Sequence, residues 1–278
     1  MTPAILRYTA FTDDPAGGNP AGVVLDASAL SAEQMQAIAA DLGYSETAFA
    51  TKRADGGYDV RYFSPEAEVP FCGHATIATG VALAERDGAG PRTFHTPPGA
   101  VPVDTQATNG EVTATLTSVV PRVEEVRQEL LGNALTALGW SESDLDPSLP
   151  PRIGFAGARH LILGAATRGR LADLDYDFDA LKQLMLAHDL TTVDLVNQEN
   201  PTTYHARNPF PVGGVVEDPA TGAAAAAFGA YLKALNLITP PTTVTIHQGV
   251  DMRRPSLLTV EIASDRPEIR VSGRAVAM

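Results

Sequence analysis

Cysteine is almost absent from this 278-residue chain, which carries only Cys72. A single thiol cannot form an internal disulfide, so we expect a protein of a reducing compartment. Long apolar runs are also missing, because the segment around Ala223–Ala227 is too short and too rich in alanine and glycine to cross a bilayer. The N-terminus leads directly into strand-like sequence, without a charged and then apolar leader. We therefore expect a soluble, cytoplasmic protein with no membrane partner.

Positive charge is scarce as well, with 20 Lys and Arg against 33 Asp and Glu and a net charge of −13. No basic run interrupts this acidity, so a nucleic-acid partner is not expected. The Gly-x-Ser-x-Gly elbow, the phosphate-binding loop and the three-glycine dinucleotide fingerprint are all missing, and we expect no cofactor. The histidines do not fall at metal-ligand spacing, so no zinc site is predicted; they are His74, His95, His160, His188, His205 and His247. What remains is acid–base chemistry by carboxylates and imidazoles.

Short strands follow one another through the chain, and each half contains one helix built from small residues. The segment Tyr58–Phe63 alternates apolar and polar positions as a strand does. The first small-residue helix is predicted from about Gly73 to Glu85, and the second from Pro219 to Leu235. Because alanine and glycine allow other backbone to approach closely, we expect a curved sheet around a central helix in each half.

A linker is predicted between the halves at Ser118–Arg122, where the strand pattern stops. Pro121 precedes a helix predicted over Val123–Leu138. This divides the chain into an N-terminal lobe, 1–118, and a C-terminal lobe, 119–278. The terminal strand is a candidate to cross into the first lobe.

Both small-residue helices start at a turn that carries a titratable group. His74 lies one residue past Gly73, and Asp218 precedes Pro219 in the manner of an N-cap. Helix N-termini carry unpaired N–H groups and the positive end of the macrodipole, so they bind anions. Two such starts facing each other would hold a carboxylate between them. The same dipole would lower the pKa of His74 and leave its imidazole neutral.

Each candidate residue also fits a purely structural role, and the residues alone leave both possibilities open. Glu46 follows the helix end at Gly43 and fits a surface glutamate beside a turn. His74 and Asp218 fit helix caps without a chemical role. Cys72 fits a nucleophile or proton carrier, but equally a small buried apolar residue.

Several segments, in order along nearly the whole chain, match the motifs of a known family. They are Phe11–Thr12, Gly17–Leu25, Ser45–Phe49, Arg61–Pro65, Glu68–Thr76, Gly214–Gly222, Gln248–Gly249 and Arg254–Ser256. The most specific are Gly-His-Ala-Thr and Asp-Pro-Ala-Thr-Gly, and the stretch from about Val120 to Leu195 matches least. On these segments the sequence resembles the phenazine-biosynthesis PhzF-like family, which shares the diaminopimelate epimerase fold.

The resemblance implies an α+β fold of two pseudo-symmetric lobes. Each would be a curved, mostly antiparallel, barrel-like sheet around a central helix, with the active site in the inter-lobe cleft. It also implies a cofactor-independent isomerase that moves a proton on a small carboxylate substrate, with a cyclic amino acid-like compound as one candidate. A homodimer is compatible with the family.

Site residues are implied in the same way. Glu46 is the expected acid/base, while His74 and Asp218 are expected to position and polarise the substrate. The backbone amides that bind the substrate carboxylate are expected at the two helix starts, which adds Gly73, Ala75, Thr221, Gly222 and Ala223 to the site.

One departure from the family pattern concerns Ala223, because serine is common at this position. The backbone N–H survives the change but a hydroxyl donor to a charged ligand is lost, which is worth roughly 1.5–3 kcal/mol. Two alternatives therefore stay open: a one-base epimerase or racemase of an amino or hydroxy acid, and a non-catalytic ligand-binding or scaffold protein. A two-thiol racemase is excluded because Cys72 has no second cysteine as a partner.

Overall fold

The computed structural model describes residues 3–278, and the chain divides into two compact units. Unit 1 is Met1–Ser118 with Arg270–Met278, and unit 2 is Val119–Ile269. The second unit thus ends at Ile269 and not at the C-terminus, because the last strand pairs with strands of unit 1. Within residues 3–278, no helix combines the length and the apolar character that a membrane span requires.

Unit 1 consists of short strands and two helices. Its strands are β1 (Leu6–Ala10), β2 (Asn19–Val24), β3 (Glu46–Lys52), β4 (Tyr58–Phe63), β5 (Glu68–Val69), β6 (Gly90–Thr96), β7 (Gly99–Thr108), β8 (Glu111–Thr117) and β17 (Ile269–Ala277). Its helices are α1 (Ala32–Leu42) and α2 (Gly73–Asp87). The start of α1 follows from the capping box predicted by Ser31 and Gln34, and the helix ends at Gly43 in the left-handed conformation.

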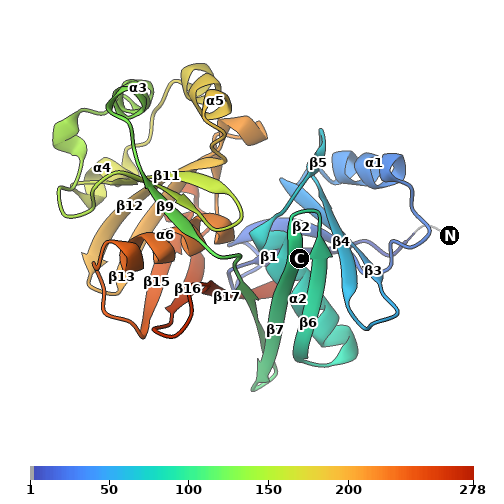
Figure 1. Cartoon of the computed structure of the whole chain (residues 1–278). Coiled ribbons are helices and arrows are strands. Elements are labelled where there is room, and N and C mark those ends of the chain that lie inside the picture. Colours follow the sequence, from blue (N-terminus) through green and yellow to red (C-terminus); the bar gives the residue numbers. More distant parts are fainter. Residues whose placement is uncertain (1–2) are drawn as a thin grey trace. The chain divides into compact units, whose positions relative to one another are not determined.

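The strands of unit 1 close into a ring around α2 (Figure 1). Pairing runs from β1 through β2, β3, β4, β6, β7, β8 and β17 and then returns to β1. The pairs β2–β3 and β4–β6 are parallel, and the others in the ring are antiparallel. Because the ring is closed, each of these strands has a pairing partner on both sides over at least part of its length.

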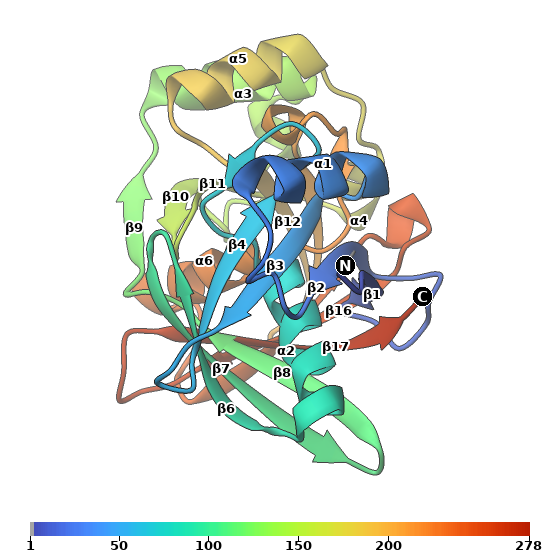
Figure 2. The same ribbon diagram turned by 90° about the vertical axis from the view of Figure 1, so that its right-hand side faces the viewer.

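Helix α2 occupies the inside of this ring, as Figure 2 shows from a second direction. All of its residues from Gly73 to Ala84 are buried, so the helix has no solvent-facing side along this stretch. Small residues are needed because the strands approach closely. A Cβ on Gly80 would lie 3.0 Å from Val103 Cγ1 and 3.3 Å from Ala114 Cβ.

Unit 2 repeats this plan with further helices. Its strands are β9 (Arg122–Glu125), β10 (Arg152–Phe155), β11 (Arg159–Gly164), β12 (Thr192–Asn200), β13 (Thr203–Pro209), β14 (Glu217–Asp218), β15 (Thr242–Gln248) and β16 (Ser256–Ile262). Its α-helices are α3 (Gln128–Leu138), α4 (Arg168–Ala172), α5 (Phe178–Ala187) and α6 (Gly222–Ala234), and its 3-10 turns are η1 (Glu142–Asp144), η2 (Pro211–Gly213) and η3 (Val250–Met252).

The curved sheet of unit 2 surrounds α6 (Figure 1). The strand order is β9, β10, β11, β12, β13, β15, β16, with parallel pairs β11–β12 and β13–β15 and antiparallel pairs elsewhere. Helix α6 contacts β9, β10, β11 and β16, and its residues Gly222 to Leu232 are buried. Each unit is therefore a curved, mostly antiparallel sheet around one small-residue helix.

Two predicted helix starts were wrong. The helix expected from Val123 begins at Gln128, because Arg122–Glu125 pairs with β10 as a strand. The helix expected from Pro219 begins at Gly222. In both cases a few residues before the helix belong to a strand or loop that is held by distant residues, which local sequence patterns do not report.

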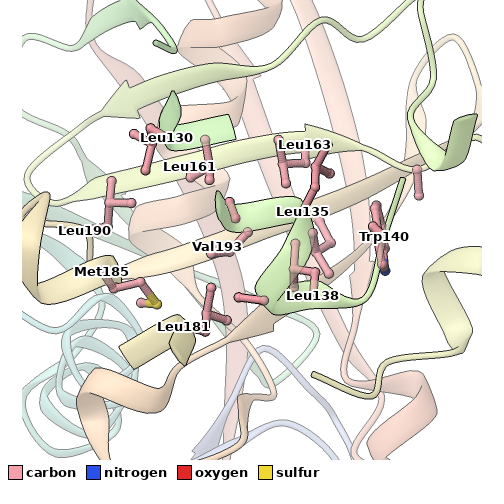
Figure 3. Packing of buried hydrophobic residues seen from close by; sticks show 14 of the residues in the cluster. Leu130, Leu135, Leu138, Trp140, Leu161, Leu163, Leu181, Met185, Leu190 and Val193 are labelled. Carbon is pink, nitrogen blue, oxygen red and sulfur yellow. The ribbon is translucent and has the colours of Figure 1, made fainter. Parts of the chain in front are cut away.

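A second apolar layer covers the other face of the unit 2 sheet. Helices α3 and α5 contact each other and pack on β11 and β12 (Figure 3). The buried side chains of this cluster include Leu130, Leu135, Leu138, Trp140, Leu161, Leu163, Leu181, Met185, Leu190, Val193 and Leu195. Since α6 contacts β11 and this cluster covers the other face, β11 is buried on both sides, as strands in covered sheets are.

Gly229 in α6 tests how tightly the central helix is packed. A Cβ at this position would lie 2.7 Å from Val260 Cγ1 and 2.9 Å from Ile269 Cγ2. We expect Gly229→Ala to lower the free energy of unfolding by about 1–3 kcal/mol through overpacking. The matched control is Gly132→Ala in α3, where a Cβ meets nothing within 4 Å and the helix should gain about 0.5–1 kcal/mol. Urea unfolding of both variants measures this, and equal stability of the two would contradict close packing of α6.

Candidate active site

Glu46 is the first residue of β3 and its side chain is buried. The residue is 7% exposed, and its Oε2 atom has no hydrogen-bond partner. Burial raises the pKa of the Glu46 carboxyl, while hydrogen bonds with Ser45 and Cys72 oppose this shift. The alternative of a surface glutamate beside a turn is therefore wrong. A buried carboxyl with an unsatisfied oxygen is instead typical of a site prepared for a proton or a ligand.

His74 lies next to this carboxyl, in the first turn of α2. Its Nε2 is 3.5 Å from Glu46 Oε2 and 3.4 Å from Ser45 Oγ, and its Nδ1 is 2.9 Å from Asn19 Nδ2. Burial lowers the pKa of His74 to about 3, opposed by a hydrogen bond to the backbone of Pro20. The sequence attributed a lowered pKa to the helix dipole, whereas burial is the main cause. The imidazole is neutral at pH 7, so its contact with Glu46 is not an ion pair.

Cys72 occupies the N-cap position of α2 without capping it. Its backbone is extended and its side chain makes no cap hydrogen bond. The thiol Sγ instead lies 3.3 Å from His74 Nδ1 and 3.8 Å from His74 Nε2. The amides of Gly73, His74 and Ala75 precede the first intrahelical bond, which Thr76 donates to Cys72 O. These are the amides that the sequence predicted for anion binding.

Asp218 is the last residue of β14, which corrects its predicted position as a helix N-cap. It pairs with Asn208 of β13, and the N-cap of α6 is Thr221. The carboxylate of Asp218 accepts a 2.6 Å hydrogen bond from the Thr221 hydroxyl. Thr221 therefore orients Asp218 and leaves the first turn of α6 without a side-chain cap.

Gln248, at the end of β15, organises this helix start and was not predicted as a site residue. Its Oε1 accepts a 3.0 Å hydrogen bond from Thr221 N–H, and its Nε2 donates a 2.8 Å bond to the backbone oxygen of Asp218. The Thr221 amide is thus already used, so of the three amides expected to bind an anion those of Gly222 and Ala223 remain candidates. Gln248 belonged to a family-matching segment, but only the fold brings it to α6.

Replacing Gln248 by leucine should affect both stability and substrate binding. Gln248→Leu removes the partners of the Thr221 amide and the Asp218 carbonyl. We expect a loss of about 1–3 kcal/mol in unfolding free energy, as for unsatisfied buried groups, and a raised KM because the α6 start is no longer held. The control is Gln106→Leu, at an exposed position of β7, with an effect within about 0.5 kcal/mol. Urea unfolding and steady-state kinetics measure this; equal effects of the two variants would contradict the assigned role.

The predicted site residues thus lie in two groups, which Cys72 and Gln248 join. In unit 1, Glu46, Cys72 and His74 lie together at the α2 start, with the Gly73 and Ala75 amides beside them. In unit 2, the α6 start has its own cluster, which consists of Asp218, Thr221, Gly222, Ala223 and Gln248. Each group combines a carboxylate with an uncapped N-terminus of a buried helix.

Comparison with known proteins agrees with this architecture. The sequence model of the PhzC-PhzF family, described as phenazine biosynthesis-like protein, matches residues 8–278. The uncharacterized isomerase YddE of Salmonella typhimurium is 34% identical, with 100% of this chain and 97% of the relative covered. Trans-2,3-dihydro-3-hydroxyanthranilate isomerase of Pseudomonas chlororaphis is 32% identical, with coverages of 96% and 94%.

Among solved structures, a PhzF-family phenazine biosynthesis protein of Bacillus anthracis is similar to this chain with a TM-score of 0.89. It is 27% identical, and the match covers 100% of this chain and 98% of that one. The family model and the relatives span nearly the full length, so they include both helix starts. The chain therefore belongs to the phenazine biosynthesis-like PhzC-PhzF family and is an isomerase.

Proposed function

We propose that this isomerase moves a proton between two carbons of a small carboxylate-bearing substrate, with Glu46 as the acid/base. The observation that carries the proposal is the state of the Glu46 carboxyl. It is buried, one of its oxygens has no hydrogen-bond partner, and its pKa is raised. A raised pKa makes the ionised form a stronger base and keeps the protonated form available nearer to neutral pH.

The groups around Glu46 suit this role. A neutral His74 can donate or accept a proton in a hydrogen bond without adding charge. Uncapped amides at Gly73 and Ala75 point to a negatively charged partner, since the N-terminus of α2 has no acidic residue in its first turn. A substrate carboxylate would satisfy these amides.

The α6 start supports recognition of a polar substituent. Asp218 is held by Thr221 and accepts hydrogen bonds, so it would bind an amino or hydroxyl group of the substrate. The amides of Gly222 and Ala223 would bind an anionic oxygen. At position 223 the alanine is 9% exposed and brings no hydroxyl. This favours a substrate that forms one polar contact fewer than it would form with a serine at this position.

Proton NMR in D2O tests the proposal with trans-2,3-dihydro-3-hydroxyanthranilate, the compound in the name of the Pseudomonas relative. We expect conversion with uptake of one solvent deuteron at carbon, abolished in Glu46→Gln. The control is Glu66→Gln, which changes an exposed glutamate and should convert the compound at the wild-type rate.

Other outcomes would redirect or end the proposal. Deuterium uptake with an unchanged bonding pattern and inverted configuration would identify a one-base epimerase instead. If this compound persists, a panel of small amino and hydroxy acids follows, because Ala223 then excludes the substrate but not the chemistry. Absence of Glu46-dependent exchange with every acid in the panel would refute proton transfer.

A further inference from the structure

Asn19 contacts the candidate active site from β2, and the chemistry proposed above gives it no role. The residue is 1% exposed, and its amide nitrogen Nδ2 lies 2.9 Å from His74 Nδ1. An amide nitrogen can only donate a hydrogen bond, so His74 Nδ1 is the acceptor of this bond. A neutral-ring nitrogen that accepts a hydrogen bond carries no proton. The contact therefore determines which of the two imidazole nitrogens is protonated.

The protonation state of the ring leaves one position for its hydrogen. Burial lowers the pKa of His74 to about 3, so the ring is neutral at pH 7 and carries a single N–H. Since Nδ1 accepts from Asn19, this N–H lies at Nε2. The hydrogen bond between His74 and the Pro20 backbone agrees with a ring donor, because proline has no N–H and only its carbonyl oxygen can take part.

The protonated nitrogen of His74 lies beside the carboxyl of Glu46. The distance from His74 Nε2 to Glu46 Oε2 is 3.5 Å, and the distance to Ser45 Oγ is 3.4 Å. Although 3.5 Å is too long for an ordinary hydrogen bond, the positive hydrogen of an N–H at this place favours the ionised carboxylate. The ionised form is the one that accepts a proton from carbon. In the other tautomer, a nitrogen lone pair at Nε2 would repel it.

The backbone around Asn19 holds its amide in place. Asn19 is the first residue of β2 and pairs with Ala10 of β1. Gly18, the residue before it, has a φ of +64°, and a Cβ there would lie 2.4 Å from Ala10 O. Only glycine lets the chain turn so closely against β1 directly before Asn19. Strand β2 also pairs with β3 at Ala21 and Glu46, so the amide and the acid/base are carried by neighbouring strands.

We propose that Asn19 is a positioning residue, which holds the His74 ring in the tautomer protonated at Nε2 and so keeps an N–H beside Glu46. No substrate or cofactor takes part in this selection, because the amide only favours one of two positions of the ring proton. The tautomer stands on the contacts of Asn19 alone, while its effect on turnover rests on the function proposed for Glu46.

Nitrogen NMR of the full-length protein with isotope-labelled histidine tests the tautomer without any substrate. A long-range proton–nitrogen correlation distinguishes protonated from bare ring nitrogens, and couplings to the ring C–H groups identify Nδ1 and Nε2. At pH 7 we expect His74 to show a bare Nδ1 and a protonated Nε2. The signals of His74 are those missing from His74→Gln, among the 6 histidines of the chain. A protonated Nδ1 in the wild type would overturn the proposal.

Asn19→Asp should reverse the tautomer, because a carboxylate can only accept and Nδ1 then has to carry the proton. The matched control, Asn133→Asp, makes the same change at an exposed position of α3 and should leave the His74 spectrum unchanged. Asn19→Ala covers the case that Asn19→Asp does not fold, and it should show a second population protonated at Nδ1. If neither Asn19 variant alters the His74 spectrum, another contact sets the tautomer and the proposal is wrong.

Turnover separates this positioning role from a merely structural one. With a converted acid, Asn19→Asp should lower kcat by about 10²–10⁴-fold, since a wrong histidine tautomer costs about 10⁴-fold in a serine protease. KM should change much less, because the amide acts on the ring and not on the substrate. Wild-type turnover with a reversed tautomer would refute the effect on Glu46. A full rate in Glu46→Gln would instead refute the proposed function and leave the tautomer assignment intact.

Discussion

Glu46→Gln is expected to reduce kcat by about 10²–10⁴-fold, the range that a positioned general acid or base contributes. The amide keeps the shape of the side chain but cannot accept a proton from carbon. Steady-state kinetics on any converted substrate measures the effect. A variant that retains more than about a tenth of the wild-type kcat would remove Glu46 from the chemical step.

The same variant should be more stable than the wild type at neutral pH, which distinguishes lost chemistry from lost folding. Burial raises the folded-state pKa of Glu46 above its ordinary value of 4.5. Glu46 therefore favours folding fully below its unfolded pKa, and this contribution is lost as pH rises through the folded pKa. The melting temperature of Glu46→Gln should increase relative to that of the wild type as pH rises from about 4.5. A constant difference across pH would contradict the shift.

Arg207→Met is expected to lower the free energy of unfolding by about 3–5 kcal/mol, the cost of leaving one member of a buried ion pair alone. Arg207 Nε donates a 2.9 Å hydrogen bond to Glu217 Oε1, and the two side chains are only 11% and 3% exposed. Arg207 also donates to the backbone oxygen of Ala172 at 2.6 Å. Because Glu217 directly precedes Asp218 in β14, turnover should fall as well. Urea unfolding measures the stability change.

Two controls make this result specific. Arg61→Met breaks a similar two-point pair with Glu68 whose side chains are 37% and 35% exposed, and it should cost less than about 1 kcal/mol. The double variant Arg207→Met, Glu217→Leu removes both buried charges and should recover most of the lost stability. If the double variant is as unstable as the single one, the ion pair is not the cause.

The sequence predicted the parts of the fold that depend on local residues. Ser31 and Gln34 indicated the start of α1, and the alanines and glycines of α2 and α6 indicated helices with close neighbours on every side. The start of α3 was placed too early because Arg122–Glu125 is held as a strand by β10, far away in the chain. Such pairings leave no mark on local periodicity.

In the candidate site, too, the residues within local motifs were predicted and the contacts between distant residues were not. Glu46 and His74 were predicted from motifs, and the fold adds that Glu46 is buried. Contacts between distant residues were missed, notably Gln248 on Thr221 and the position of Asp218 in a strand. In the sequence, Cys72 does not differ from an ordinary small apolar residue. Only the short distance between its thiol and His74 in the structure distinguishes it from one.

The pairing of β17 between β1 and β8 has a consequence for the order in which the chain folds during synthesis. The first unit lacks one strand of its ring until the ribosome has made all of unit 2, since β17 begins at Ile269, the last residue of that unit. At ordinary translation rates this delay is about 8–30 s. Throughout that time β1 and β8 each present an unpaired edge, so nascent chains carry a risk of aggregation or strand exchange that the finished protein does not. The second unit, whose strands are continuous in the chain, can complete its sheet first.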